Sequence, residues 1–255
     1  MKNTVYLVII TIVFISCAPK HQGVMPYTVT APLTLKDSSF IKKYKRIVFG
    51  NTDAKTPNNS KLINWAAPIY IYFDKTVPEK HSEQLMSFAE DLSKDIDSLS
   101  ISRVWDKSAS NYLVYYLNDD NSIDYQPKIK SKYVGGYIKW GSDCIIDNGY
   151  LRVDTRNKMP KQMLLLHAKV HFYRSLGYFQ TIDDETHVID YLNSAFANKK
   201  VLSQFDKDVV KYHYSVNVGR GMTKKMFETI QNMKTNVLEK HPKTKIKIRH
   251  EYDDN

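Results

Sequence analysis

The sequence predicts an α+β fold built on a mixed sheet of about four to five strands, with one central helix and further helices at the C-terminal end. Three observations favour this class. Short segments rich in β-branched and aromatic residues are bounded by turn residues, as strands usually are. Longer segments repeat apolar residues with a period near 3.6, as amphipathic helices do. Along the chain these segments run strand, helix, three strands and then helices, without an internal repeat.

The first part of the chain holds a helix, a strand and a second helix. Residues 38–48 place their apolar side chains on one helical face. Residues 69–73 follow a proline and read Ile-Tyr-Ile-Tyr-Phe, so we expect a strand in which Tyr70 and Tyr72 share one face. A helix is expected over residues 78–97, because its apolar residues return every three or four positions.

The second part of the chain begins with strands and ends with helices. Further strands are expected at residues 112–117, 136–140 and 150–154. The central helix is expected from Pro160, which suits a first helical position, to Gly177, which suits the position after a helix end. Ser203 and Thr223 are typical N-caps and predict two more helices. Alternating residues 244–249 predict a cationic edge strand.

The N-terminal segment has the pattern of a bacterial lipoprotein signal. Residues 1–16 carry one lysine, then an apolar run too short to cross a membrane comfortably, then small residues. The sequence Phe14-Ile15-Ser16-Cys17 resembles a lipobox, in which the cysteine is acylated and becomes the first mature residue. We therefore expect a signal peptide at 1–16, a lipid-anchored tether at 17–37 and a folded domain at 38–255. The alternative is an ordinary signal peptide with a chance cysteine.

Location and cysteine use follow from this expectation. Ala18 stands where enterobacterial lipoproteins retained in the inner membrane have aspartate, so the default expectation is an outer-membrane anchor facing the periplasm. With Cys17 acylated, Cys144 is the one remaining thiol, and the fold has no internal disulfide. Cys144 lies among apolar residues and is expected to be a buried small hydrophobic residue rather than a nucleophile.

The charge balance bears on possible partners. The chain has a formal charge of +10, and residues 1–16 contribute only Lys2 to it, which leaves +9 after the signal. Such an excess attracts anionic lipid headgroups, lipopolysaccharide phosphates or acidic glycans. Nucleic acid is not expected outside the cytoplasm, and no nucleic-acid-binding motif is present. The 18 tyrosines suit a glycan- or peptide-binding surface, although many of them also suit the edge of a core.

The central helix carries two histidines at helical spacing. His167 and His171 are four residues apart, so both side chains leave the same face of the helix, as the pair in H-E-x-x-H zinc enzymes does. Zinc peptidases also need a general base, usually the glutamate after the first histidine, and Ala168 occupies that position. The chain has no G-x-S-x-G motif for a serine nucleophile, and Ser142 suits a turn.

Several segments together resemble a family. They are Leu62–Phe73, with a tryptophan before Ala-Pro and a strand; the helix end Ser175-Leu176-Gly177-Tyr178; and Leu202–Tyr214 followed by Gly219–Thr223. This order is similar to that of secreted bacterial proteins related to zincins, of the metzincin and matrixin type, in which a helix ending L-G is followed by a loop and L-S-x-x-D. The resemblance covers roughly residues 60–230 and implies a zincin-like fold with an active-site-type helix.

Two alignments with that family are possible. In the first, His167 and His171 are the zinc pair, although the number of residues from His171 to Gly177 is then larger than in H-E-x-x-H-x-L-G enzymes. In the second, Leu176-Gly177 is matched to the family's L-G, and Val170, His171 and Arg174 fall where His, Glu and His belong. We prefer the second, because helix-end positions are restricted by backbone geometry. It matches none of the catalytic residues and implies a lipoprotein that lacks the H-E-x-x-H motif.

The functional hypotheses follow from these alternatives. The first is a lipid-anchored envelope protein whose non-catalytic zincin-like domain binds a glycan, a lipid or an envelope protein, with no cofactor. The second is a divergent zinc peptidase that uses His167 and His171, with His187 or a carboxylate from Asp183, Asp184 or Glu185 as third ligand. The third is a structural lipoprotein whose basic surface holds anionic headgroups. If the histidines bind no metal, His167 is expected to pack inward, and His171 is expected to be solvated or hydrogen-bonded.

Overall fold

The computed structural model describes residues 28–32, 36–50, 61–120, 123–180, 203–215 and 218–249. The helices are α1 (Ser38–Phe49), α2 (Glu79–Ser93), η1 (Lys107–Ala109, a 3-10 turn), α3 (Lys161–Ser175), α5 (Gln204–His213) and α6 (Lys224–Lys240). The strands are β1 (Thr28–Pro32), β2 (Asn64–Trp65), β3 (Ile69–Phe73), β4 (Ile101–Val104), β5 (Tyr112–Leu117), β6 (Val134–Trp140), β7 (Ile145–Asp154) and β8 (Lys245–Arg249).

The main sheet has six strands. Its order is β2-β7-β5-β3-β4, with β6 paired to β7. All neighbouring strands are parallel except β6, which runs antiparallel to β7 along almost its whole length. β1 and β8 form a separate antiparallel ribbon. The parallel pairs need crossover connections, and α2 provides the one between β3 and β4.

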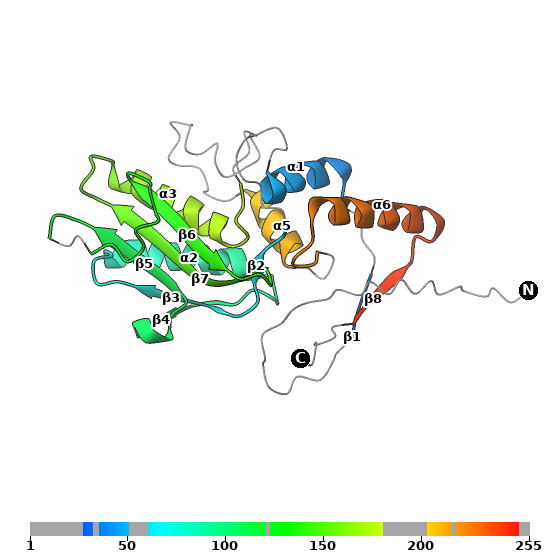
Figure 1. The fold of residues 1–255 in the computed structure, drawn as a ribbon, viewed down its shortest axis with the longest axis horizontal. Coiled ribbons are helices and arrows are strands. Elements are labelled where there is room, and N and C mark those ends of the chain that lie inside the picture. The colour runs from blue at the N-terminus through cyan, green and yellow to red at the C-terminus, as the bar shows by residue number, and fades with distance from the viewer. Residues whose placement is uncertain are drawn as a thin grey trace, which may run out of the picture.

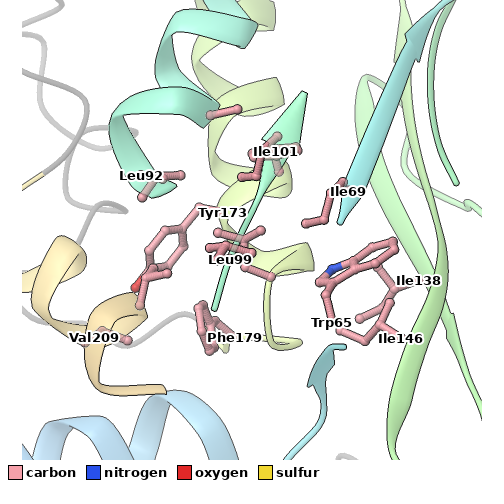
Figure 2. Close-up of a cluster of buried hydrophobic side chains, with 14 of the residues drawn as sticks. Trp65, Ile69, Leu92, Leu99, Ile101, Ile138, Ile146, Tyr173, Phe179 and Val209 are labelled. Atoms are coloured by element: carbon pink, nitrogen blue, oxygen red, sulfur yellow. The ribbon is translucent and has the colours of Figure 1, made fainter. Parts of the chain in front are cut away.

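Helices α2 and α3 lie against one face of the sheet (Figure 1). The ring of Phe172 in α3 packs 6.5 Å from Phe88 of α2 and 5.2 Å from Tyr112 of β5. Buried side chains from both helices form one continuous core with Val114 and Leu151 of the sheet. Figure 2 shows part of this core, with Trp65 and Ile146 close to the strands and Tyr173 near α5. This face of the sheet therefore supplies most of the apolar burial.

The opposite face of the sheet carries a much smaller cluster. Leu113, Tyr115 and Leu117 are buried there, and Tyr72, Tyr125 and Tyr150 pack on them half-buried. All six are strand or loop residues. Since alternate residues of a strand point to opposite faces, the two clusters separate the odd and even positions of β5. We call this side of the sheet the open face.

A group of helices lies at the other end of the molecule. α1, α5 and α6 are side by side (Figure 1). Their contact is aromatic: the ring of Tyr44 in α1 lies 4.8 Å from Tyr212 of α5 and 5.5 Å from Phe227 of α6. Ser203 and Thr223 cap α5 and α6, accepting hydrogen bonds from the backbone N–H of Asp206 and Met226. The Asp206 carboxylate in turn accepts a hydrogen bond from the Ser203 N–H, which completes a capping box.

The mixed helix-and-strand fold expected from the sequence is confirmed, with corrections. The expected helices and strands within the described residues are present, and residues 245–249 do form a strand. The sheet has six strands rather than four to five, because the short strands β2 and β4 were not foreseen. Residues 28–32, within the segment expected to be a tether, pair with β8. Cys144 is buried in the core, as expected.

Candidate functional site

The C-terminal end of α3 is held by two side chains from other elements. The indole N–H of Trp65 donates to the Ser175 carbonyl at 3.0 Å, and the Tyr214 hydroxyl donates to the Leu176 carbonyl at 2.6 Å. The Tyr214 oxygen also accepts from the Trp65 backbone N–H at 3.3 Å. These bonds satisfy carbonyls that a helix end leaves without a partner. They fix α3 against β2 and α5 and so fix the position of its histidines.

The glycine after α3 is required for space. Gly177 occupies the expected place beyond the helix end, but the positive φ falls on the next residue, Tyr178, at 54°. A Cβ on Gly177 would lie 2.3 Å from the Phe179 ring and 2.8 Å from Nε2 of His213. The Leu-Gly pair is therefore constrained here by side-chain packing, a different reason from the backbone geometry expected from the sequence.

The two histidines of α3 lie in different surroundings. Burial lowers the pKa of the His167 ring below its ordinary value. Burial lowers the pKa of His171 further, to about 4, and the nearby Arg174 and His167 add to this effect, while a hydrogen bond with the Val134 backbone opposes it. His171 faces β6: a Cβ added to Gly136 of that strand would lie 3.5 Å from the Cβ of His171. Both rings are therefore neutral at pH 7, and His171 is the more buried.

The other α3 positions compared with the zinc family do not offer ligands. Val170 and Ala168 are buried in the core, so neither faces a solvent-filled site. The Nε of Arg174 donates to the Phe179 carbonyl at 3.0 Å, so this side chain fixes the segment that follows the helix. Burial lowers the pKa of Arg174, but a guanidinium stays protonated at neutral pH and cannot bind a metal cation.

The third ligand proposed for a metal lies outside the described residues. His187, Asp183, Asp184 and Glu185 all fall in this part of the chain, and so does the lipobox residue Cys17. Among the residues that the structure describes, no three His, Cys, Asp or Glu side chains come together as a metal site would require. The described part of α3 therefore provides two neutral imidazoles and no carboxylate beside them.

A third histidine, not singled out in the sequence, lies closest to the core. His213 is almost fully buried: its Nε2 lies 2.9 Å from the Ile63 carbonyl and its Nδ1 lies 2.9 Å from the Tyr44 hydroxyl. The carbonyl can only accept, so Nε2 carries the proton and Nδ1 accepts from the tyrosine. Burial lowers the pKa of His213 to about 4. Both ring nitrogens are used within the fold, so His213 is structural.

A row of side chains crosses the open face of the sheet. The register pairs Tyr137 of β6 with Tyr150 of β7, Tyr150 with Leu113 of β5, and Leu113 with Tyr72 of β3. The four residues therefore lie on one line perpendicular to the strands. The Tyr137 and Tyr150 rings are 6.3 Å apart and tilted by 52°. We call Tyr137, Tyr150 and Tyr72 the tyrosine row; all three are half-buried.

Lysines surround the tyrosine row. The ammonium of Lys128 lies 5.5 Å from the centre of the Tyr137 ring and 3.4 Å from its hydroxyl. Lys139, two residues along β6 on the same face, is exposed and lies 3.7 Å from Asp147. The Lys107 ammonium lies 3.7 Å above the ring of Tyr125, which borders the row. Ammonium groups therefore border the tyrosine rings on this part of the open face.

A buried ionic network anchors the loop that borders the row. Arg152 of β7 donates to the carboxylate of Asp124 at 2.7 Å and also to the Ser131 carbonyl. The Tyr115 hydroxyl donates to the same carboxylate. Desolvation opposes ionisation of Asp124, but these hydrogen bonds and Arg152 outweigh it, so the pKa of this carboxyl is lowered. The network keeps Tyr125 and Lys128 beside the sheet, so the border of the row is preorganised.

No protein-family model matches the chain, and a search of curated proteins finds no significant match. Among the described residues, no helix is both long and apolar enough to cross a membrane. Two surfaces of the described residues are therefore candidates for a function, the histidine face of α3 and the open face of the sheet.

Proposed function

We propose that this chain is a lipid-anchored protein of the bacterial cell envelope whose zincin-like domain is non-catalytic and acts as a binding module. The observation that carries this proposal is the composition of α3. In the alignment anchored at Leu176-Gly177, the metal positions hold Val170, which is buried in the core, and Arg174, which is bonded to a backbone carbonyl. A buried aliphatic side chain and a guanidinium cannot hold zinc.

The zincin-like assignment is supported by several features of the fold. A mixed sheet packs on a long helix that ends at Leu176-Gly177, and C-terminal helices follow. The Leu-Ser-x-x-Asp segment that carried the resemblance opens α5, where Ser203 and Asp206 form a capping box. The resemblance thus falls on positions with a clear structural role, namely a helix end and a helix start.

The envelope location depends on the sequence around Cys17. The lipobox-like residues at the end of an apolar run support acylation of this cysteine. Metabolic labelling with palmitate tests the anchor directly. We expect label in the full chain and none in a Cys17→Ser variant of it, which would instead be released from the membrane. Equal labelling of the two chains would remove the lipid anchor from the proposal.

A second candidate function is a divergent zinc peptidase. Its supporting observation is that His167 and His171 share one face of α3 and that burial keeps both rings neutral, as a metal ligand must be. A water-activating carboxylate would then have to come from Asp183, Asp184 or Glu185. We favour the binding module because α3 itself brings no carboxylate to the pair.

Metal analysis decides between the two functions. The full chain is purified in detergent without chelator, and zinc is measured per mole of protein. The binding module predicts far less than one equivalent and a melting temperature that EDTA does not change. One equivalent of zinc, lost in a His167→Ala/His171→Ala variant that still melts cooperatively, would establish a metal site and overturn the non-catalytic assignment. Lys80→Ala on α2 is a matched surface control.

A further inference from the structure

The open face of the sheet has the geometry of a platform for an extended ligand. Neighbouring strands lie about 4.8 Å apart, so the line from Tyr137 across β7 and β5 to Tyr72 is about 14 Å long. Only Leu113 interrupts the tyrosines on this line, and it is buried beneath them. The platform therefore has the length of several linked sugar rings rather than of a single small molecule.

The chemistry of the row favours a carbohydrate. Tyrosine offers a flat apolar face together with a hydroxyl, which suits the C–H faces and hydroxyl groups of a pyranose ring. The row is half-buried: Tyr72 and Tyr150 pack on the buried cluster below them, and the ring of Tyr137 lies against that of Tyr150. The large apolar side chains with most exposure, Trp105, Ile123, Met226 and Met233, lie outside the row. The row thus lacks the protruding apolar tips that insertion into a lipid layer requires.

The charge around the row selects an acidic carbohydrate. Lys128 and Lys139 are exposed at the β6 end of the row, and Lys107 lies at its border. The ion pair between Lys139 and Asp147 is long and exposed, so it is weak and can yield to a carboxylate on a ligand. The Asp124 carboxylate is already bonded to Arg152 and Tyr115 and adds no free negative charge nearby. The formal charge of +10 gives attraction at longer range.

We propose that the open face binds an acidic polysaccharide chain, with Tyr137, Tyr150 and Tyr72 stacking on the sugar rings and Lys128 and Lys139 pairing with their carboxylates. This inference rests on the proposed role as a binding module and names the ligand chemistry of that module. The site lies on the opposite side of the sheet from α3, so it does not involve His167 or His171.

Titration calorimetry with defined oligomers tests the proposal. The full chain in detergent is titrated with oligogalacturonate and, for comparison, with neutral dextran oligomers. We expect binding of the acidic oligomer alone, weakening as salt is raised. Tyr137→Ala and Tyr150→Ala are expected to weaken binding about ten-fold each through lost stacking, with cooperative melting retained.

Charge variants provide a test that does not disturb packing. Lys128→Gln/Lys139→Gln should weaken binding and reduce its salt dependence, because two charges that meet the ligand are removed. The matched control is Lys80→Gln/Lys94→Gln, which removes the same charge from exposed positions on and just after α2, on the other side of the sheet. This control should bind like the unaltered chain.

Four results would overturn the inference. They are absence of oligogalacturonate binding, equal binding by the row variants, equal loss in the α2 control, and stronger binding to vesicles containing phosphatidylglycerol or to a single-stranded oligonucleotide. Zinc is measured on the same sample. Stoichiometric zinc would count against the non-catalytic assignment whatever the calorimetry shows. If the chain binds neither zinc nor the acidic oligosaccharide, only the polysaccharide inference fails and the non-catalytic assignment stands.

Discussion

The hydroxyl of Tyr214 is the best single test of how α3 is held in place. Tyr214 is almost fully buried, and its hydroxyl donates to the Leu176 carbonyl at 2.6 Å and accepts from the Trp65 N–H at 3.3 Å. Tyr214→Phe removes both bonds and keeps the ring. A buried polar group left without a partner costs about 1–3 kcal/mol. The bond to Leu176 is short and the bond from Trp65 is long, so we expect a total loss of about 2–3 kcal/mol, dominated by Leu176.

The assay is urea unfolding followed by circular dichroism, together with thermal melting. For a domain of this size, about 2–3 kcal/mol corresponds to a fall in melting temperature of about 5–10 °C. Tyr70→Phe is the matched control, because the Tyr70 ring is 40% exposed on the open face and its loss of a hydroxyl should change stability by less than about 0.5 kcal/mol. If Tyr214→Phe lost no more stability than Tyr70→Phe at an unchanged urea m-value, the conclusion that the Tyr214 hydroxyl holds the end of α3 would be refuted.

Three further predictions concern packing, protonation and capping. Gly177→Ala should lower the free energy of unfolding by about 1–3 kcal/mol, because the added methyl group would overlap the rings of Phe179 and His213. Gly136→Ala is the control and should be tolerated, because its methyl group would lie at an ordinary contact distance of 3.5 Å from His171; equal melting temperatures of the two variants would contradict the prediction. Burial lowers the pKa of both His213 and His171 from 6.5 to about 4, so at pH 5 the unfolded chain binds a proton at each ring that the native chain does not. Each histidine should therefore lower stability by about 2 kcal/mol between pH 8 and pH 5, and urea midpoints that stay constant over this range would exclude this effect. Ser203→Ala should cost about 1 kcal/mol through loss of the α5 cap, measured by the same unfolding assay, and a cost no greater than that of Gln204→Ala would argue against the capping box.

The elements that the sequence predicted correctly are those with a signal of their own. The strand at 69–73 alternates between buried and more exposed residues, and α5 and α6 begin at the caps Ser203 and Thr223. β2 is two residues long and β4 four, so neither contains enough residues to show a period. Both are defined by pairing with β7 and β3, which lie far along the chain or across a helix.

The candidate sites show the same division between local and long-range information. The spacing of His167 and His171 is visible in the sequence because it is local to one helix. The tyrosine row is not, because it requires the registers of β6, β7, β5 and β3 together, and a shift of one residue in β6, β7 or β3 would move its tyrosine to the other face. The burial of His213 is likewise set by contacts with residues 150 and 169 positions away.

The two faces of the sheet make the functional alternatives separable by mutation. The helix-covered face holds the large core, so substitutions around α3 change stability and any metal site together. The buried hydrophobic cluster on the open face consists of Leu113, Tyr115 and Leu117, and changes at exposed Lys128 and Lys139 leave that small cluster intact. A ligand that binds the open face should therefore lose affinity in the lysine variants without a change in melting temperature. A ligand that binds beside α3 should be insensitive to those lysines and sensitive to His167 and His171.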